Sequence, residues 1–173
     1  LVDWTLEKAI YDAQVVPGVR RHTAPHSTEI AALFAVLTRM RKPTADRFAR
    51  PLATLAGDLT PLEKADLYAL GTVPPKLSAE QSKELRAGIE ALYHEGDVYP
   101  NYEGRTGASP REIRSVLLDA AQHPGYKCLS PFAVLERIAD LCTHRNEFDW
   151  LRQEPVTGGF HDPRYFQKVL RDR

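Results

Sequence analysis

Signals for helix starts occur along the whole chain and constrain its fold more than any other feature. In four places a residue with a capping side chain stands directly before a proline: Thr60-Pro61, Ser109-Pro110, Ser130-Pro131 and Asp162-Pro163. A proline in the first helical position after such a cap is typical of helix N-termini. Glu63 and Glu112 complete capping boxes at two of these sites, and Ser78 forms a further box with Gln81. The sequence therefore predicts five helix starts.

Apolar residues between these starts recur every three or four positions, which is the helical spacing. Three stripes follow this spacing: Ile30, Leu33, Phe34, Leu37 and Met40; Ile113, Val116, Leu117 and Ala120; and Leu135, Ile138, Ala139 and Cys142. Stops are expected at Gly71, Gly96 and Pro124-Gly125. The predicted helices are 4–15, 27–41, 45–56 with a potential break at Pro51, 60–70, 79–94, 110–122, 131–144 and 163–172. Almost no segment alternates as a strand does, so we expect an all-α multi-helix bundle.

The composition narrows the class of protein. With 173 residues, of which 43% are hydrophobic and 27% charged, the chain has the make-up of a globular protein with one or two packed units. Its longest apolar runs, such as 30–37, are too short to cross a bilayer, so we expect a cytoplasmic protein without a membrane partner. The chain begins at Leu1 and ends within an amphipathic run, which suggests a piece of a longer protein.

The net charge is zero, but the charges are unevenly distributed. Residues 18–56 carry seven basic and two acidic side chains, a net charge of +5. Residues 57–103 carry four basic and nine acidic side chains, a net charge of −5. The zero total gives no reason to expect nucleic-acid binding. Either the two segments form complementary surfaces within one protein, or the basic segment faces a phosphate-bearing ligand or a neighbouring subunit.

Familiar catalytic and metal-binding patterns are missing from the sequence. It contains no G-x-x-x-x-G-K-[ST] loop, no G-x-S-x-G elbow and no H-E-x-x-H helix, so we assign no catalytic residue. His22 and His26 are four residues apart, but Pro25 favours a turn between them, and no metal site is expected there. Cys128, Cys142 and His144 are too few for a structural zinc site. The place of Cys142 on an apolar stripe predicts a core thiol.

His26 precedes the most hydrophobic predicted helix and has two interpretations. In the first, His26 caps the helix and packs against neighbouring residues. In the second, its ring nitrogens contact another subunit or lie near a nucleotide.

The segment 101–114 is the most informative part of the sequence. Gly104 and Gly107 loosen the backbone just before a helix capped by Ser109, and the unpaired amides of such a helix end favour phosphate oxygens. Arg111 falls in the first turn of that helix. From the residues alone, Arg111 either forms a surface salt bridge or senses an anion.

The run YEGRTGASPREIR at 102–114 resembles the bacterial PrkA family of serine protein kinases, which have an AAA+ ATPase core. Further blocks resemble the same family: APH at 24–26, FAVLTR at 34–39, LTPLEKADLY at 59–68, KCLSPFAVLE at 127–136 and QEP at 153–155. By this resemblance, 1–21 would connect to an ATPase core outside the chain, 22–124 would form a helical AAA+ lid-like subdomain, and 125–173 would begin a small helical C-terminal extension.

The resemblance also implies roles for particular residues. The stretch GASPR at 107–111 is similar to the second sensor motif of AAA+ proteins, in which an arginine reaches the phosphates of ATP. Arg111 occupies that position, and Arg105 and Ser109 are further nucleotide-sensing candidates. His26 and Arg39 are candidates for an interface. ATP and Mg²⁺ would bind only together with the core, and this chain alone is expected to bind neither and to be inactive.

The resulting hypothesis is a non-catalytic lid and C-terminal segment that senses nucleotide and couples it to protein phosphorylation. Its partners would be its own AAA+ core, a protein substrate and, in the full-length protein, further copies of itself. The alternative is a regulatory protein-interaction module of an AAA+ remodelling or proteolytic machine, which would have the same features in this segment.

Overall fold

The computed structural model describes residues 2–97 and 102–173. Within these ranges the chain forms nine α-helices. They are α1 (Trp4–Gln14), α2 (Ser27–Arg39), α3 (Leu52–Gly57), α4 (Pro61–Leu70), α5 (Ala79–Ala87), α6 (Ile89–Gly96), α7 (Pro110–Ala121), α8 (Pro131–Thr143) and α9 (Pro163–Asp172). The β-structure of the described residues consists of isolated bridges, Thr23 with Leu129 and Val156 with Phe160. The predicted all-α fold is confirmed.

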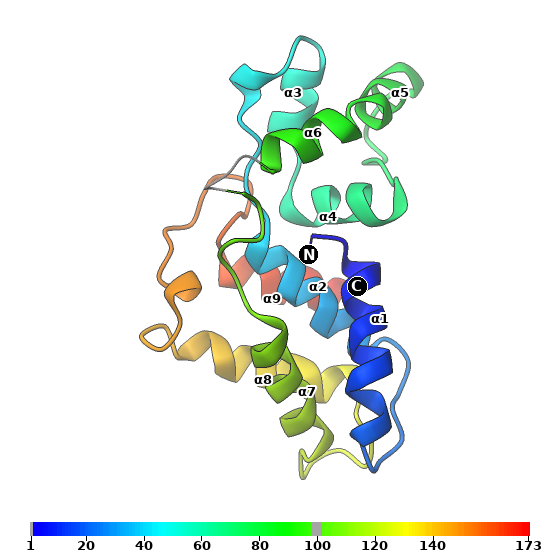
Figure 1. Ribbon diagram of the computed structural model, residues 1–173, viewed down its shortest axis with the longest axis vertical. Helices are drawn as coiled ribbons and strands as arrows, with labels where there is room; N and C mark the ends of the chain where they lie inside the picture. Colours follow the sequence, from blue (N-terminus) through cyan, green and yellow to red (C-terminus); the bar gives the residue numbers. More distant parts are fainter. Residues whose placement is uncertain (1, 98–101) are drawn as a thin grey trace.

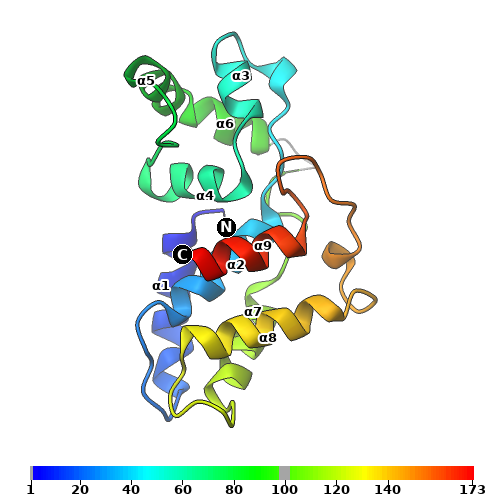
Figure 2. The same cartoon turned by 180° about the vertical axis from the view of Figure 1, so that it is seen from behind.

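Helix α2 lies at the centre of the larger of two helical groups, surrounded by α1, α7, α8 and α9 (Figures 1 and 2). All of its residues except Glu29 are buried. From Ile30 to Leu37 the helix is apolar on every side, so this part has no face to offer to water and needs such a position. Near its middle, the Phe34 ring meets Trp150 and Phe166 edge-on, with centroids 5.9 and 6.4 Å apart. These aromatic pairs join α2 to the C-terminal part of the chain.

Helices α3 to α6 form the second group, at the top of Figure 1. Helix α4 contacts α1 and α2, whereas α3 packs against α5. Arg173, directly after α9, adds a link between the groups: its Nη1 lies 2.9 Å from Asp66 Oδ2 on α4, and its guanidinium lies 5.5 Å from the Trp4 ring. The domain boundaries expected from the sequence, between residues 21 and 22 and between residues 124 and 125, stay predictions. In the structure, α1, α8 and α9 share one hydrophobic core with α2.

The predicted helix starts agree closely with the structure. Thr60, Ser78 and Ser109 each form a complete capping box, and the side chains of Ser130 and Asp162 accept hydrogen bonds from the first turns of α8 and α9. These starts depend on contacts within four residues, so local sequence is sufficient to specify them.

Three predicted features differ from the structure. The single helix expected at 79–94 is two helices, because the chain breaks at Gly88, where an added Cβ would lie 2.5 Å from Leu52 Cδ1 of α3. The segment expected as a helix at 45–56 is interrupted before Leu52, in agreement with the potential break at Pro51, but its first part is only a 3-10 turn at Ala45–Arg47. Helix α8 buries Ala133, Val134 and Ile138 most deeply, so its inner face is rotated from the predicted stripe.

Within residues 2–97 and 102–173, no helix combines the length and apolar character needed to cross a membrane.

Candidate functional site

The loop that leads into α7, residues 102–109, runs between the two helical groups and carries the nucleotide-sensing candidate Arg105. Its C-terminal end is fixed to the end of α2. The backbone nitrogen of Ala108 donates to Thr38 Oγ1 at 2.8 Å, and its carbonyl oxygen accepts from Nε and Nη2 of Arg39 at 2.9 and 2.7 Å. Ala108 is fully buried. The start of α7 is thus held in place by three hydrogen bonds from α2.

Arg39 also forms a buried ion pair across α1 and α2. Its Nη1 lies 2.9 Å from Oε2 of Glu7 and its Nη2 lies 2.8 Å from Oε1, while the Tyr11 hydroxyl donates to the same Oε1 at 2.5 Å. Burial alone would raise the pKa of Glu7, but the hydrogen bonds from Arg39 and Tyr11 outweigh it and hold the pKa below its ordinary value. The carboxylate is therefore ionised and keeps Arg39 oriented toward the loop.

The N-terminal end of the loop is fixed by a second buried ion pair. Lys64 on α4 donates from Nζ to Glu103 Oε1 at 2.6 Å and to the carbonyl oxygen of Arg41 at 2.7 Å. The backbone nitrogen of Arg41 donates to the same carboxylate at 2.7 Å. Burial lowers the pKa of Lys64, although the Glu103 carboxylate opposes that shift. Glu103 thus joins the second helical group to the chain that leaves α2.

Gly107 permits the close approach of the loop to α2. Its φ is +127°, and a Cβ there would lie 2.6 Å from Arg39 Cγ and 2.9 Å from the Thr38 carbonyl oxygen. A side chain would collide with the helix, and this backbone conformation is one that glycine adopts readily. The sequence predicted that Gly107 loosens the backbone before α7, whereas in the structure this glycine allows the loop to pack closely against α2.

The structure separates the two arginine candidates for nucleotide sensing. Arg111 lies on the exposed side of the first turn of α7, where its guanidinium has no hydrogen-bond or ion-pair partner among the described residues. Ser109 acts as the cap of that helix: its Oγ accepts from the Glu112 nitrogen at 3.3 Å, and its own nitrogen donates to Glu112 Oε2 at 2.5 Å. Ser109 and Arg111 are thereby placed on one fixed helix end.

Arg105 lies in a small pocket of about 220 Å³, which the sequence did not predict. The pocket is lined by Arg41, Tyr102, Arg105, Thr106, Gln153 and His161. Three separate segments contribute to it: the residues after α2, the loop before α7 and the segment before α9. Arg41 lies in the basic segment 18–56. No local sequence pattern predicts that Gln153 and His161 lie beside it.

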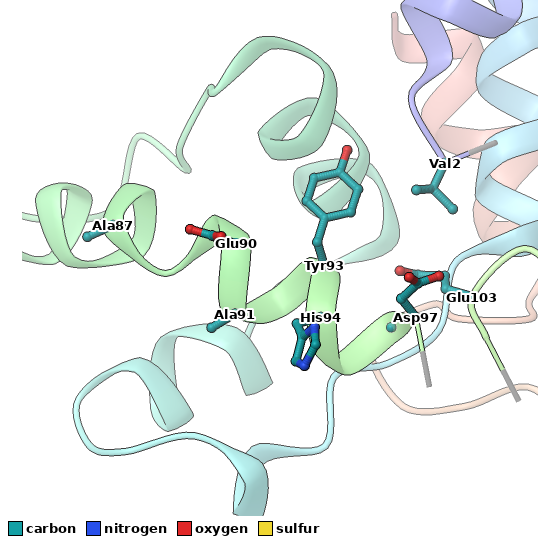
Figure 3. Close-up of a pocket in the computed structure, with 9 residues that line it drawn as sticks. Val2, Ala87, Glu90, Ala91, Tyr93, His94, Asp97 and Glu103 are labelled. Atoms are coloured by element: carbon teal, nitrogen blue, oxygen red, sulfur yellow. The ribbon is translucent and has the colours of Figure 1, made fainter. Parts of the chain in front are cut away.

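A larger pocket, of about 820 Å³, lies beside α6 (Figure 3). It is lined by Val2, Ala87, Glu90, Ala91, Tyr93, His94, Gly96, Asp97 and Glu103. No residue predicted from the sequence to act in a site lies there. The Tyr93 ring stacks on Tyr68, with centroids 4.0 Å apart, so this side of α6 is packed onto α4.

The remaining residues singled out from the sequence make contacts that support the fold. His26 is the exposed N-terminal cap residue of α2, with Nδ1 2.9 Å from Glu29 Oε2. Arg39 is only 4% exposed, so the structure gives it an internal ion pair instead of a surface contact. Cys142 is partly buried against the core, as predicted for a core thiol, and burial raises its pKa to about 11. Among the described residues, no group of three or more potential metal ligands occurs.

Comparison with known proteins identifies the family. The model of the PrkA serine protein kinase C-terminal domain matches residues 62–173, which run from the second residue of α4 through α9 and include the loop before α7 and Arg111. No curated protein and no solved structure matches the chain. Because the family model covers more than half of the sequence, this chain belongs to the PrkA serine protein kinase family, through its C-terminal domain.

Proposed function

We propose that this chain is the helical lid and part of the C-terminal region of an ATP-dependent serine protein kinase, in which Arg111 senses the bound nucleotide. The observation that carries the proposal is the fixed start of α7. Buried ion pairs hold the loop at Glu103 and at Ala108, and Arg111 extends from the helix that follows. Because the helix end is already fixed, a side chain on it loses little conformational freedom when it binds a ligand.

The chemistry of Arg111 fits a terminal phosphate. A guanidinium donates two parallel hydrogen bonds to phosphate oxygens, and its charge is permanent. In the full-length protein, closure of the lid over the ATPase core would bring Arg111 to the γ-phosphate, so closure would depend on ATP and not on ADP. ATP and Mg²⁺ would be held by the core, and Arg105, on the same loop, is the second candidate for this contact.

The lid would transmit the nucleotide state through its rigid connections. Lys64 and Glu103 join α4 to the loop, and Arg39 joins the loop to α2 and α1. A movement of α7 would therefore carry both helical groups with it, which couples the core to the region that handles the protein substrate. The expected partners are the AAA+ core of the same protein, a protein substrate and further copies of the full-length chain, in the cytoplasm.

The kinase assignment is tested with radiolabelled ATP and a serine-containing protein acceptor. The full-length protein should transfer label to serine, and a variant with a disabled nucleotide-binding core should not. ATP hydrolysis without any transfer would overturn the kinase function and favour the alternative, an interaction module of a remodelling or proteolytic machine.

A further inference from the structure

The pocket around Arg105 has an unusual lining. Among the residues that the structure describes, six line it: Arg41, Tyr102, Arg105, Thr106, Gln153 and His161. Each of these six side chains carries at least one hydrogen-bond donor, and none of the six is a carboxylate. Two of them are guanidinium groups with fixed positive charge. A pocket with this lining is complementary to a ligand that only accepts hydrogen bonds and carries negative charge.

The carboxylate closest in the loop sequence, that of Glu103, forms its ion pair with Lys64 on α4. Glu103 is the only acidic residue in 102–109, and its side chain is 4% exposed. Its Oε1 accepts from Lys64 Nζ and from the Arg41 nitrogen, so its charge is balanced on the α4 side of the loop. The described residues that line the pocket with Arg41, Arg105 and His161 include no acidic side chain.

His161 is held in the pocket by the loop before α9. Phe160 is fully buried and forms a bridge with Val156, whose nitrogen donates to the Phe160 carbonyl oxygen at 2.7 Å. The next residue, His161, has a φ of 56°, in the left-handed region that few residues other than glycine adopt. Such a backbone persists only where the surrounding contacts impose it, and it is frequent at ligand sites.

The electrostatics of His161 agree with a basic pocket. Burial and the charge of Arg41 lower the pKa of its imidazole. At neutral pH the ring is therefore uncharged and offers one N–H donor. An anion between Arg41 and His161 would reverse the effect of Arg41 and raise that pKa, which gives a direct readout of binding.

From this lining we infer that the Arg41–Arg105–His161 pocket binds a phosphate group, either as inorganic phosphate or as a phosphomonoester. The two guanidinium groups would hold the oxygens by charge-assisted hydrogen bonds, and Thr106, Gln153 and Tyr102 would supply neutral donors. The volume of about 220 Å³ admits a phosphate group. The pocket contains Arg105, the second nucleotide-sensing candidate, but not Arg111, and this chain would bind the phosphate group there without the ATPase core.

The test is a titration of the 173-residue chain at pH 7.5 and low ionic strength, followed through the NMR signals of the His161 ring. Inorganic phosphate and O-phosphoserine are used as separate probes, and the one that binds more tightly identifies the source of the phosphate group. We expect saturable binding with a dissociation constant of about 1 mM for at least one of them. The pKa of His161 should rise in the complex.

Arg41→Gln and Arg105→Gln should each weaken this binding about tenfold or more, because each removes a charged, bidentate donor. Both side chains are exposed, so the fold should be kept, and circular dichroism checks this. Arg164→Gln removes the same charge from the exposed side of α9, outside the pocket, and should change the affinity less than twofold. Arg111→Ala should also leave it unchanged. Non-saturable shifts with both probes, or equal binding by the pocket variants and the Arg164 control, would overturn the inference.

Discussion

Arg39 on α2 and Glu7 on α1 form a bidentate ion pair in the core, with nitrogen to oxygen distances of 2.9 and 2.8 Å, and the same guanidinium donates to the Ala108 carbonyl oxygen. Two helices and the loop before α7 therefore meet at one side chain. A buried charge that loses its partner is far more costly than an exposed one, so this pair is a sensitive point of the fold.

Glu7→Gln should lower the free energy of unfolding by about 3–5 kcal/mol, because it leaves the Arg39 charge buried without a counter-ion. Denaturant unfolding of the purified chain measures the change. Lys8→Gln is the matched control: it removes the partly exposed Lys8–Asp12 pair, and the expected loss is below about 1 kcal/mol. A Glu7→Gln variant as stable as the control would show that the pair does not support the core.

The same pair should make stability depend on acid pH. Because the folded state holds the pKa of Glu7 below its ordinary value of 4.5, the unfolded chain binds a proton more readily. The stabilisation by Glu7 is fully present above pH 4.5, and it is lost as the pH falls through the lowered pKa of Glu7 in the folded state. The stability difference between wild type and Glu7→Gln should therefore shrink in acid. A difference that grows as the pH falls would contradict the assigned direction.

Gly107→Ala should destabilise the chain by about 1–3 kcal/mol or more, since the backbone is in a region costly for alanine and the Cβ would meet Arg39 and Thr38. Thermal or denaturant unfolding measures this loss. Gly18→Ala is the control, because a Cβ at Gly18 has no atom within 4 Å and its φ is not positive. Equal stability of the two variants would argue against the close approach of the loop to α2.

The local features of this fold could be predicted from the sequence, whereas features that depend on distant partners could not. The box of Ser109 with Glu112 is specified within four residues, so the start of α7 was predictable. At Gly88, where α5 ends, the backbone lies against Leu52 of α3, and no local pattern contains that contact. For the same reason Arg39 was expected at an interface, although Glu7 holds it inside.

In the candidate site, too, local features could be predicted from the sequence and contacts between distant segments could not. Arg105 and Arg111 are candidates from the sequence because they lie in one segment with a family resemblance. The pocket of Arg105 also needs Arg41 and His161, which are far away in the sequence and are brought together only by the packing of α2 and α9. Lys64 gave an overlooked signal: it is adjacent to Ala65 and three positions from Leu67, on the face of α4 that is buried. A lysine in that position needs a buried acidic partner.

Arg111, the proposed nucleotide sensor, has suitable control residues close by. Arg114 is on the exposed side of the same helix, and Arg105 is in the preceding loop. Arg111→Ala should leave the fold of the full-length protein within about 0.5 kcal/mol of wild type, because its guanidinium has no partner among the described residues. Arg111→Lys should restore only part of the function, since an ammonium group cannot donate in the bidentate manner.

The most direct measurement is the ATPase activity of the full-length protein, with its affinities for ATP and ADP, in Arg111→Ala, Arg105→Ala and Arg114→Ala. Arg111→Ala should lower ATP-dependent turnover roughly ten- to a hundredfold, which corresponds to about 1.5–3 kcal/mol for a hydrogen bond to a charged group, and should remove the preference for ATP over ADP. Arg114→Ala should have a much smaller effect. Wild-type activity and ATP affinity in Arg111→Ala, together with loss of both in Arg105→Ala, would contradict the account and assign the sensor to Arg105.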